Sequence, residues 1–366
     1  MAVDRALLEI IRCPECRGTL SAFDSGGRGC QASASSNGAR VLRCEACSRW
    51  FPIVDEIPRL LPDVLRDVRS DEDFFASNQG AFSQLPAPRS HFGSRTATPD
   101  VHRQFQKQRL LWGTQERWED LYLAPVRYAA PDRAPNPHAK TFFSMNLHCH
   151  YGTQPRKDEI IVQTAASGGK LTLDIGCAAA GKRALLRENG NRYVGLDVQA
   201  FSGPDIQATA ASLPFGDATF DFVICDSVLE HVHDPWKVSA EIFRILKPGA
   251  KGLFVVPFIY KSHGAPFDFF RYTKSGLHTL LRQYSVVKIF SFGGFFHVAG
   301  HMAEAFYPHV PLGFGRVLKA IHNCIFYVLN KLDRFDRYRI FSRGYLLRPG
   351  GEVRASGRRA TGVGAQ

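Results

Sequence analysis

The pattern of hydrophobic and polar positions predicts alternating strands and helices in the second half of the chain. Short apolar or β-branched runs predict strands at 171–175, 193–197, 220–225 and 252–256. The clearest helix between them is 235–246, with Asp234 as its expected N-cap. One face of that helix should carry Trp236, Ala240, Phe243 and Leu246. Strands separated by helices favour parallel pairing, and hence a doubly wound α/β sheet.

The chain is long enough for two domains and a small module. It has 366 residues, of which 45% are hydrophobic and 22% charged, and this is ordinary globular composition. We expect a compact module at 1–62, a linker and helical segment at 63–150, a larger domain at 151–348 and a disordered basic tail at 349–366. No segment predicts a membrane span or a secretory signal, so a cytoplasmic protein is expected.

Four of the nine cysteines form two Cys-x-x-Cys pairs, with 27 residues between the pairs. They are Cys13, Cys16, Cys44 and Cys47. Without an export signal such pairs indicate metal binding before disulfides. Four thiolates in a small module are typical of a structural zinc ion, and redox-active or free thiols are the alternative. The stretch from Leu7 to Leu61, with both knuckles and a closing Ile57-Pro58-Arg59-Leu60-Leu61, resembles the small zinc-ribbon proteins that activate methyltransferases.

A second motif begins at the first predicted strand of the larger domain. Asp174-Ile-Gly176-Cys177-Ala178 places an acid and a glycine-rich turn before a helix, at the carboxyl end of a parallel strand. Asp197 ends the next strand 23 residues later, where an acid can accept both hydroxyls of a ribose. By itself this pair of features is also compatible with a dinucleotide site.

Three later segments extend the pattern. They are Ser212-Leu213-Pro214-Phe215 followed by 220–223, the run 226–232 that contains Glu230-His231, and 245–249. With the turn, they resemble the class I S-adenosylmethionine-dependent methyltransferases of the broad small-molecule type. The resemblance implies a Rossmann-like sheet of seven strands with the last strand antiparallel, and S-adenosylmethionine as cofactor.

The resemblance also implies roles for particular residues. Asp174 and Gly176 would hold the methionine end of the cofactor and Asp197 would bind the ribose, and Cys177, Ala178 and Val198 would also belong to the cofactor site. Ser212 and Leu213 would flank the adenine, and Asp226 and Ser227 would line the floor beneath the sulfonium. Two departures affect this site: Ala178 and Ala180 stand where the family usually has glycine, and Thr209 stands where it usually has aspartate. A methyl group in the turn would narrow the approach of the cofactor.

The acceptor is expected to contact the segment after the fifth strand. Residues 263–273 resemble a subgroup linked to polysaccharide or glycolipid modification, and His263, Asp268, Arg271 and Tyr272 would contact the substrate. Arg271 suits a phosphate or carboxylate, with an Asp268–Arg271 salt bridge as the alternative. His231 and His263 are weak candidates for a general base, and a hydrogen-bonded structural histidine is the alternative.

Charge leaves the partners open. The net charge is +12, and residues 301–366 carry eleven Lys/Arg against four Asp/Glu. The segment 316–335 has a broad apolar face that fits either a membrane surface or a helix packed on the sheet or a dimer interface. The expected function is methyl transfer to a small-molecule, glycan or glycolipid acceptor. RNA or protein methylation and a non-catalytic scaffold are the alternatives.

Overall fold

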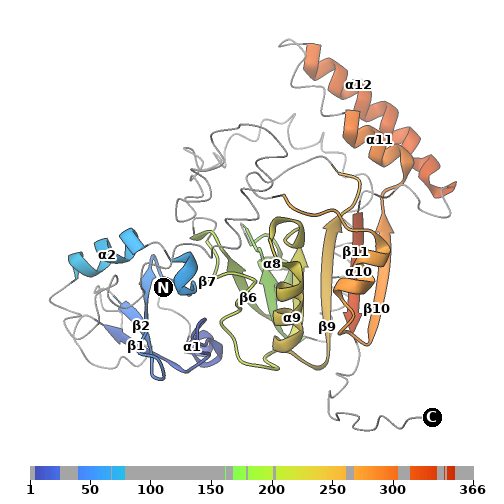
Figure 1. Ribbon diagram of the computed structural model, residues 1–366. Helices are drawn as coiled ribbons and strands as arrows, with labels where there is room; N and C mark the ends of the chain where they lie inside the picture. The colour runs from blue at the N-terminus through green and yellow to red at the C-terminus, as the bar shows by residue number, and fades with distance from the viewer. Residues whose placement is uncertain are drawn as a thin grey trace, which may run out of the picture.

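The computed structural model describes residues 5–24, 40–66, 68–78, 161, 168–178, 180–200, 203–260, 268–303, 314–335, 342 and 344–350. Within them the chain forms a four-stranded sheet near the N-terminus and a seven-stranded sheet beside it (Figure 1). Residues 79–150 of the predicted linker and helical segment, and His263, lie outside the described residues.

The N-terminal module is an antiparallel sheet, with one Cys-x-x-Cys knuckle before its first hairpin and the other after it. Its elements are α1 (Arg5–Ile10), β1 (Leu20–Asp24), β2 (Arg40–Cys44), β3 (Trp50–Val54) and β4 (Ile57–Pro58), with the strands in chain order. The 3-10 helix η1 (Asp63–Leu65) and α2 (Val68–Ser77) follow. Phe74 and Phe75 of α2 stack on Trp50 at ring-centroid distances of 6.2 and 6.1 Å. The helix α2 therefore packs back on the module.

The larger sheet has the order β10-β11-β9-β8-β5-β6-β7. Its strands are β5 (Leu171–Ile175), β6 (Arg192–Asp197), β7 (Ile206–Gln207), β8 (Phe220–Asp226), β9 (Leu246–Pro257), β10 (Val286–Phe292) and β11 (Gly344–Gly350). Strands β9, β8, β5, β6 and β7 pair in parallel, and β11 runs antiparallel to β9 and β10. The prediction of seven strands with the last antiparallel is confirmed.

The helices α8 (Lys182–Glu188), α9 (Pro235–Ile245) and α10 (Lys274–Leu280), with the 3-10 helix η3 (Leu229–His231), accompany the sheet. The Asp234 carboxylate accepts a hydrogen bond from the Lys237 backbone N–H at 3.0 Å, as the predicted cap requires. The predicted helix face is wrong. Trp236 is 53% exposed, and the buried stripe carries Val238, Ile242 and Ile245. These aliphatic side chains, spaced four and three apart, form the narrow stripe that meets the sheet.

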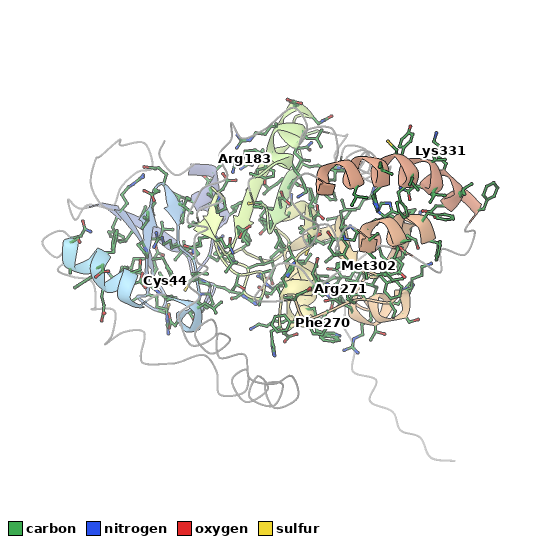
Figure 2. All side chains as sticks on the ribbon, turned by 90° about the horizontal axis from the view of Figure 1, so that it is seen from above. Cys44, Arg183, Phe270, Arg271, Met302 and Lys331 are labelled. Atoms are coloured by element: carbon green, nitrogen blue, oxygen red, sulfur yellow. The ribbon has the colours of Figure 1, made fainter. Side chains whose placement is uncertain are left out.

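A helical pair projects at the end of the molecule away from the N-terminal module, as Cys44 and Lys331 show in Figure 2. It consists of α11 (Phe295–Ala303), α12 (Phe314–Leu329) and the 3-10 helix η5 (Asn330–Phe335). The Asp333 carboxylate caps α11 by accepting from the Phe296 and His297 backbone N–H groups at 2.9 and 3.0 Å. Gly300 lets α12 approach closely, because a Cβ there would lie 2.8 Å from the Phe326 ring.

The N-terminal module continues the larger sheet at its edge. Arg59 forms a parallel bridge with Gln207 of β7, and the Leu60 N–H donates to the Gln207 carbonyl at 2.8 Å. Ile11 bridges Phe215 on the loop before β8. Buried residues of both parts belong to one hydrophobic cluster. The two parts therefore share a core.

Candidate functional site

The four cysteines of the two knuckles converge. Their Sγ atoms all lie within 4.8 Å of one another, with 3.7 Å between Cys13 and Cys47 and 3.4 Å between Cys16 and Cys44. A tetrahedral zinc ion with Zn–S bonds of about 2.3 Å needs sulfur atoms about 3.8 Å apart. The four thiols are therefore spaced to hold such an ion.

The knuckle backbones explain this convergence. Each knuckle turns through a left-handed residue four positions after its first cysteine, Arg17 with φ 62° and Ser48 with φ 57°. Gly18 allows the close approach, since a Cβ there would lie 2.9 Å from the Ala46 Cβ. Burial raises the pKa of the Cys13 thiol. Burial acts in the same direction on Cys47, but hydrogen bonds to Arg49 lower its pKa to about 7.

The turn after β5 is left-handed at three positions. Gly176 has φ 67°, and a Cβ there would lie 2.4 Å from the Val228 side chain, so only glycine fits. Ala178 and Ala180 have φ 45° and 52°, a conformation that costs a side-chain-bearing residue energy. The two alanines thus occupy positions whose backbone geometry favours glycine. Cys177 is buried, which raises the pKa of its thiol to about 12.

Asp197 anchors this turn. Its carboxylate accepts from the Ala178 and Gln199 backbone N–H groups, each at 2.9 Å. The carbonyl of the next residue, Val198, accepts from the Gln207 amide at 3.0 Å. Asp197, the acid predicted to bind the ribose, therefore lies directly beside the turn predicted to bind the methionine end.

A charged cluster joins the carboxyl ends of β5 and β8. The Lys182 ammonium lies 3.2 Å from an Asp174 oxygen and 3.5 Å from an Asp226 oxygen. The Tyr193 hydroxyl donates to the other Asp174 oxygen at 3.0 Å. Burial raises the pKa of the Asp174 carboxyl, although Lys182 opposes the shift. Ser227, at φ 58°, donates to Asp226 at 3.3 Å.

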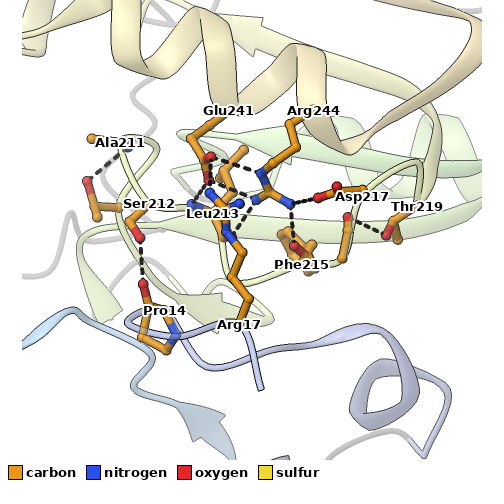
Figure 3. Close-up of polar contacts among 12 residues, drawn as sticks. Pro14, Arg17, Ala211, Ser212, Leu213, Phe215, Asp217, Thr219, Glu241 and Arg244 are labelled. Carbon is orange, nitrogen blue, oxygen red and sulfur yellow. Dashed lines mark hydrogen bonds and ion pairs between the residues drawn. The ribbon is translucent and has the colours of Figure 1, made fainter. Parts of the chain in front are cut away.

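Ser212 and Leu213 are held against the N-terminal module and α9. The Ser212 hydroxyl donates to the Pro14 carbonyl at 2.8 Å, and the Leu213 N–H donates to Glu241 at 2.9 Å (Figure 3). Arg17 and Arg244 both donate to the same Glu241 carboxylate at 2.9 Å. The loop assigned to the adenine is thus hydrogen-bonded both to the first cysteine knuckle and to α9. Its role toward a cofactor stays a prediction.

The Glu230-His231 pair lies in η3. Burial raises the pKa of the Glu230 carboxyl to about 7, and the His231 Nε2 lies 3.9 Å from it. The nearby positive charge of Arg271 opposes this shift. A carboxyl group with this pKa can exchange a proton near neutral pH.

The predicted acceptor residues are engaged within the chain. Arg271 donates to the Asp268 carboxylate at 2.7 Å and to the Tyr260 carbonyl at 3.3 Å, so the salt bridge named as the alternative is present. Tyr272 is buried and its hydroxyl donates to the Leu229 carbonyl at 2.7 Å. Tyr272 therefore fastens the segment after β9 to η3, and Arg271 links residues within that segment. His263 lies outside the described residues.

A crevice of about 550 Å³ lies between the N-terminal module and the sheet, and Tyr193 of the charged cluster is among its lining residues. Arg183, Arg187 and Arg192 line it from the sheet side, and Asp55 and Glu56 line it from the module. Arg183 is already paired with Asp205 at 3.1 Å. The mixed charge does not single out a phosphate-bearing ligand.

Sequence reasoning missed Lys182 and Tyr193 as members of the site. A lysine at the first helical position after a glycine-rich turn was an available signal for the first. Tyr193 reads as an ordinary strand residue, because only the pairing of β6 with β5 brings its hydroxyl to Asp174.

Comparison with known families adds to this geometry. Residues 173–254 match the methyltransferase domain family, and residues 4–56 match the Trm112p-like protein family. The chain carries a methyltransferase domain. The Trm112p-like domain precedes it and contains all four clustered cysteines.

Proteins of similar sequence are also named methyltransferases. An uncharacterized methyltransferase of Mycobacterium sp. (strain KMS) is 34% identical over 92 residues, which are 22% of this chain and 36% of that protein. A probable S-adenosylmethionine-dependent methyltransferase of Mycolicibacterium smegmatis is 30% identical over 113 residues, 28% of this chain and 43% of that protein. The chain therefore spans less than half the length of these relatives.

Solved structures that match part of this chain include a SAM-dependent methyltransferase from Archaeoglobus fulgidus. It is 15% identical, with a TM-score of 0.37 over 57% of this chain and 100% of that one. A chain from a complex between the Haloferax volcanii Trm112 methyltransferase activator and a methyltransferase is 17% identical, with a TM-score of 0.35 over 54% of this chain and 94% of that one. At TM-scores below 0.5 neither structure bears on the geometry of the site.

Proposed function

We propose that this chain transfers a methyl group from S-adenosylmethionine to an acceptor. One observation carries the proposal: Asp174, Asp197 and Asp226 end three neighbouring parallel strands, beside a left-handed turn. The carboxyl edge of such a sheet is where ligands of doubly wound folds bind. The methyltransferase domain match covers all three acids.

The residues present fit this cofactor. S-adenosylmethionine has an ammonium group at its methionine end and two hydroxyls on its ribose. Carboxylates can accept hydrogen bonds from both kinds of group. Asp174 and Gly176 would hold the methionine end, Asp197 the ribose, and Asp226 the floor beneath the sulfonium. When bound, the cofactor supplies a methyl group on an activated sulfur. Ser212 and Leu213 would flank its adenine.

The protein's remaining task is to position the acceptor and receive its proton. Glu230 is buried next to the strand end that carries Asp226, and its pKa of about 7 lets the carboxylate take up a proton at neutral pH. His231 lies beside it and is partly exposed. We infer that the pair relays a proton from an acceptor hydroxyl or amine, with His231 nearer the solvent.

We also infer a structural zinc ion at the four cysteines. Their spacing matches a tetrahedral site, and a module of this size gains stability from metal. Zinc content measured by atomic absorption on purified full-length protein tests this. One zinc per chain, lost in Cys16→Ser, is the expected result.

Binding of S-adenosylhomocysteine, measured by calorimetry on zinc-loaded protein, tests the cofactor site. Micromolar affinity is expected, with loss of at least tenfold in Asp197→Ala. Asp205→Ala is the matched control, because the Asp205 carboxylate also accepts a backbone N–H, from Gly195 at 2.7 Å, but has no assigned cofactor contact. Equal losses in both variants would contradict the assignment of Asp197. Absence of binding in folded protein would favour a non-catalytic scaffold.

The helical pair at the far end supports an acceptor held at a membrane. Leu318, Ile321, Ile325 and Val328 of α12 are spaced three and four residues apart, and each is at least 42% exposed. Residues 314–335 contain four Lys/Arg and one acid, and that acid, Asp333, is buried at the N-terminus of α11. None of the described helices is both long and apolar enough to cross a bilayer. Apolar side chains beside cations are typical of helices that lie on anionic lipid. We therefore favour a glycolipid or other lipid-linked acceptor over a free small molecule, RNA or protein.

Co-sedimentation with phosphatidylglycerol and phosphatidylcholine vesicles tests this surface. We expect binding to the anionic vesicles only, and its loss in Ile325→Glu. Trp236→Glu is the control, because Trp236 is equally exposed but lies on α9. Dimers in light scattering without lipid, abolished by Ile325→Glu, would instead assign the surface to a second copy of the chain.

A further inference from the structure

The proposed cofactor site already contains a cation of the protein itself. Lys182 begins α8 directly after the left-handed turn, and its ammonium lies 3.2 Å from Asp174 and 3.5 Å from Asp226. The Lys182 side chain is 17% exposed, against 0% for Asp174 and 10% for Asp226. A lysine is seldom buried to this degree without carboxylate partners.

Each oxygen of the Asp174 carboxylate already has a donor, and the Asp174 side chain is 0% exposed. Lys182 donates to its Oδ1, and the Tyr193 hydroxyl donates to its Oδ2 at 3.0 Å. Because this carboxylate is fully buried, a ligand ammonium can reach it only if one of these two groups moves aside. The Tyr193 hydroxyl is buried and comes from the neighbouring strand, whereas Lys182 has a flexible side chain, so Lys182 is the group that would move.

We propose that Lys182 determines specificity at this site: its ammonium holds the position of a ligand cation and disfavours S-adenosylmethionine relative to S-adenosylhomocysteine. The inference rests on the proposed function. The two ligands share an amino-acid end and a nucleoside and differ in the methyl group and its sulfonium charge. The sulfonium would lie above Asp226, and the Lys182 ammonium 3.5 Å from that carboxylate already offsets its charge.

The electrostatic environment keeps this lysine charged. Burial acts to lower the pKa of the Lys182 ammonium, but Asp174 and Asp226 together raise it above its ordinary value. The charge is therefore present throughout the neutral range. Because the site is partly shielded from solvent, the repulsion of a second cation a few ångströms away is screened less than on the surface.

Calorimetric titration of zinc-loaded full-length protein with each ligand separately tests the proposal. We expect Lys182→Met to shift the ratio of the two affinities about tenfold toward S-adenosylmethionine, which is about 1.4 kcal/mol. Both ligands carry the ammonium that Lys182 opposes, but only S-adenosylmethionine also carries the sulfonium. Lys182→Arg keeps the charge and should keep the original affinity ratio. Lys182→Gln replaces the methionine variant if that one fails to fold, since its amide can still donate to Asp174.

Lys247→Met is the matched control. Its ammonium pairs with Asp221 at 2.8 Å, at the opposite end of strand β8, and both affinities should be unchanged in this variant. An unchanged affinity ratio in Lys182→Met would overturn the proposal. A fall in both affinities would also overturn it, because it would mean that Lys182 holds the ligand carboxylate. Binding of neither ligand by any folded variant would refute the proposed function itself, and the specificity role with it.

Discussion

Replacing Ala178 by glycine tests whether the turn after β5 is strained. Ala178 has φ 45° and its side chain is exposed, so its methyl group contributes little to the core. The neighbouring Ala180 has a similar φ of 52°, but its methyl group packs against the buried cluster that contains Leu186 and Tyr193. The two positions share a backbone conformation and differ in packing.

The expected magnitude follows from opposing effects. A left-handed conformation costs a non-glycine residue about 1–2 kcal/mol. Glycine also increases the entropy of the unfolded chain, which lowers the free energy of unfolding by about 0.4–1 kcal/mol. We therefore expect Ala178→Gly to raise the free energy of unfolding by about 0.5–1 kcal/mol. Ala180→Gly also loses up to about 0.8 kcal/mol of methyl burial and should be close to neutral.

Urea unfolding of the zinc-loaded protein, followed by circular dichroism, measures these differences. Ala218→Gly is a positive control, because Ala218 has φ 49°, is exposed and lies outside the site. Ala240→Gly is a negative control in the exposed face of α9 and should lower the free energy of unfolding by about 1 kcal/mol. A destabilised Ala178→Gly beside a stabilised Ala218→Gly would refute the strain at the turn.

Four further outcomes are expected. The pKa of Glu230 rises from 4.5 to about 7 on folding, so the free energy of unfolding should fall by about 3 kcal/mol between pH 4.5 and 7. Urea unfolding of Glu230→Gln over the same pH range should lack this decrease. A decrease identical to that of the unchanged protein would contradict the pKa shift. Glu241→Gln should lower the free energy of unfolding by about 2–3 kcal/mol. Arg17→Ala, which removes only the half-exposed partner of that carboxylate, should cost less than about 1 kcal/mol, and equal losses would contradict this ranking. Gly18→Ala should reduce zinc content, because its methyl group would lie 2.9 Å from Ala46; full zinc occupancy would count against the tight knuckle.

Four strands of the larger sheet, β5, β6, β8 and β9, could be predicted because their central residues are buried on both faces. A strand covered on both sides is an uninterrupted apolar run, and β5 matches its predicted bounds to the residue. The face of α9 could not be predicted in the same way. Trp236 and Phe243 suggested a buried aromatic side, but these rings lie at the margin of the helix, each in an edge-on contact with another aromatic ring, Phe270 and Tyr284 respectively.

The acids of the candidate site were predictable from their position at strand ends. Their partners were not, because the ion pair of Lys182 with Asp226 depends on how the turn directs the lysine across two strands. The surroundings of Ser212 were hidden for a different reason. Its hydrogen bond reaches Pro14, 198 positions away, and no local pattern announces a contact between two domains.

The contact between the two domains protects an edge of the larger sheet. Strand β7 has only two residues and is the edge of the sheet, where unpaired backbone groups would face solvent. The N-terminal module covers that edge through Leu60, and its first knuckle holds the following loop through Pro14. Pro14 lies between two of the four clustered cysteines. A metal ion held by the four cysteines would fix this knuckle and, through Pro14, the loop that we propose flanks the adenine, so the two proposed sites would be mechanically connected.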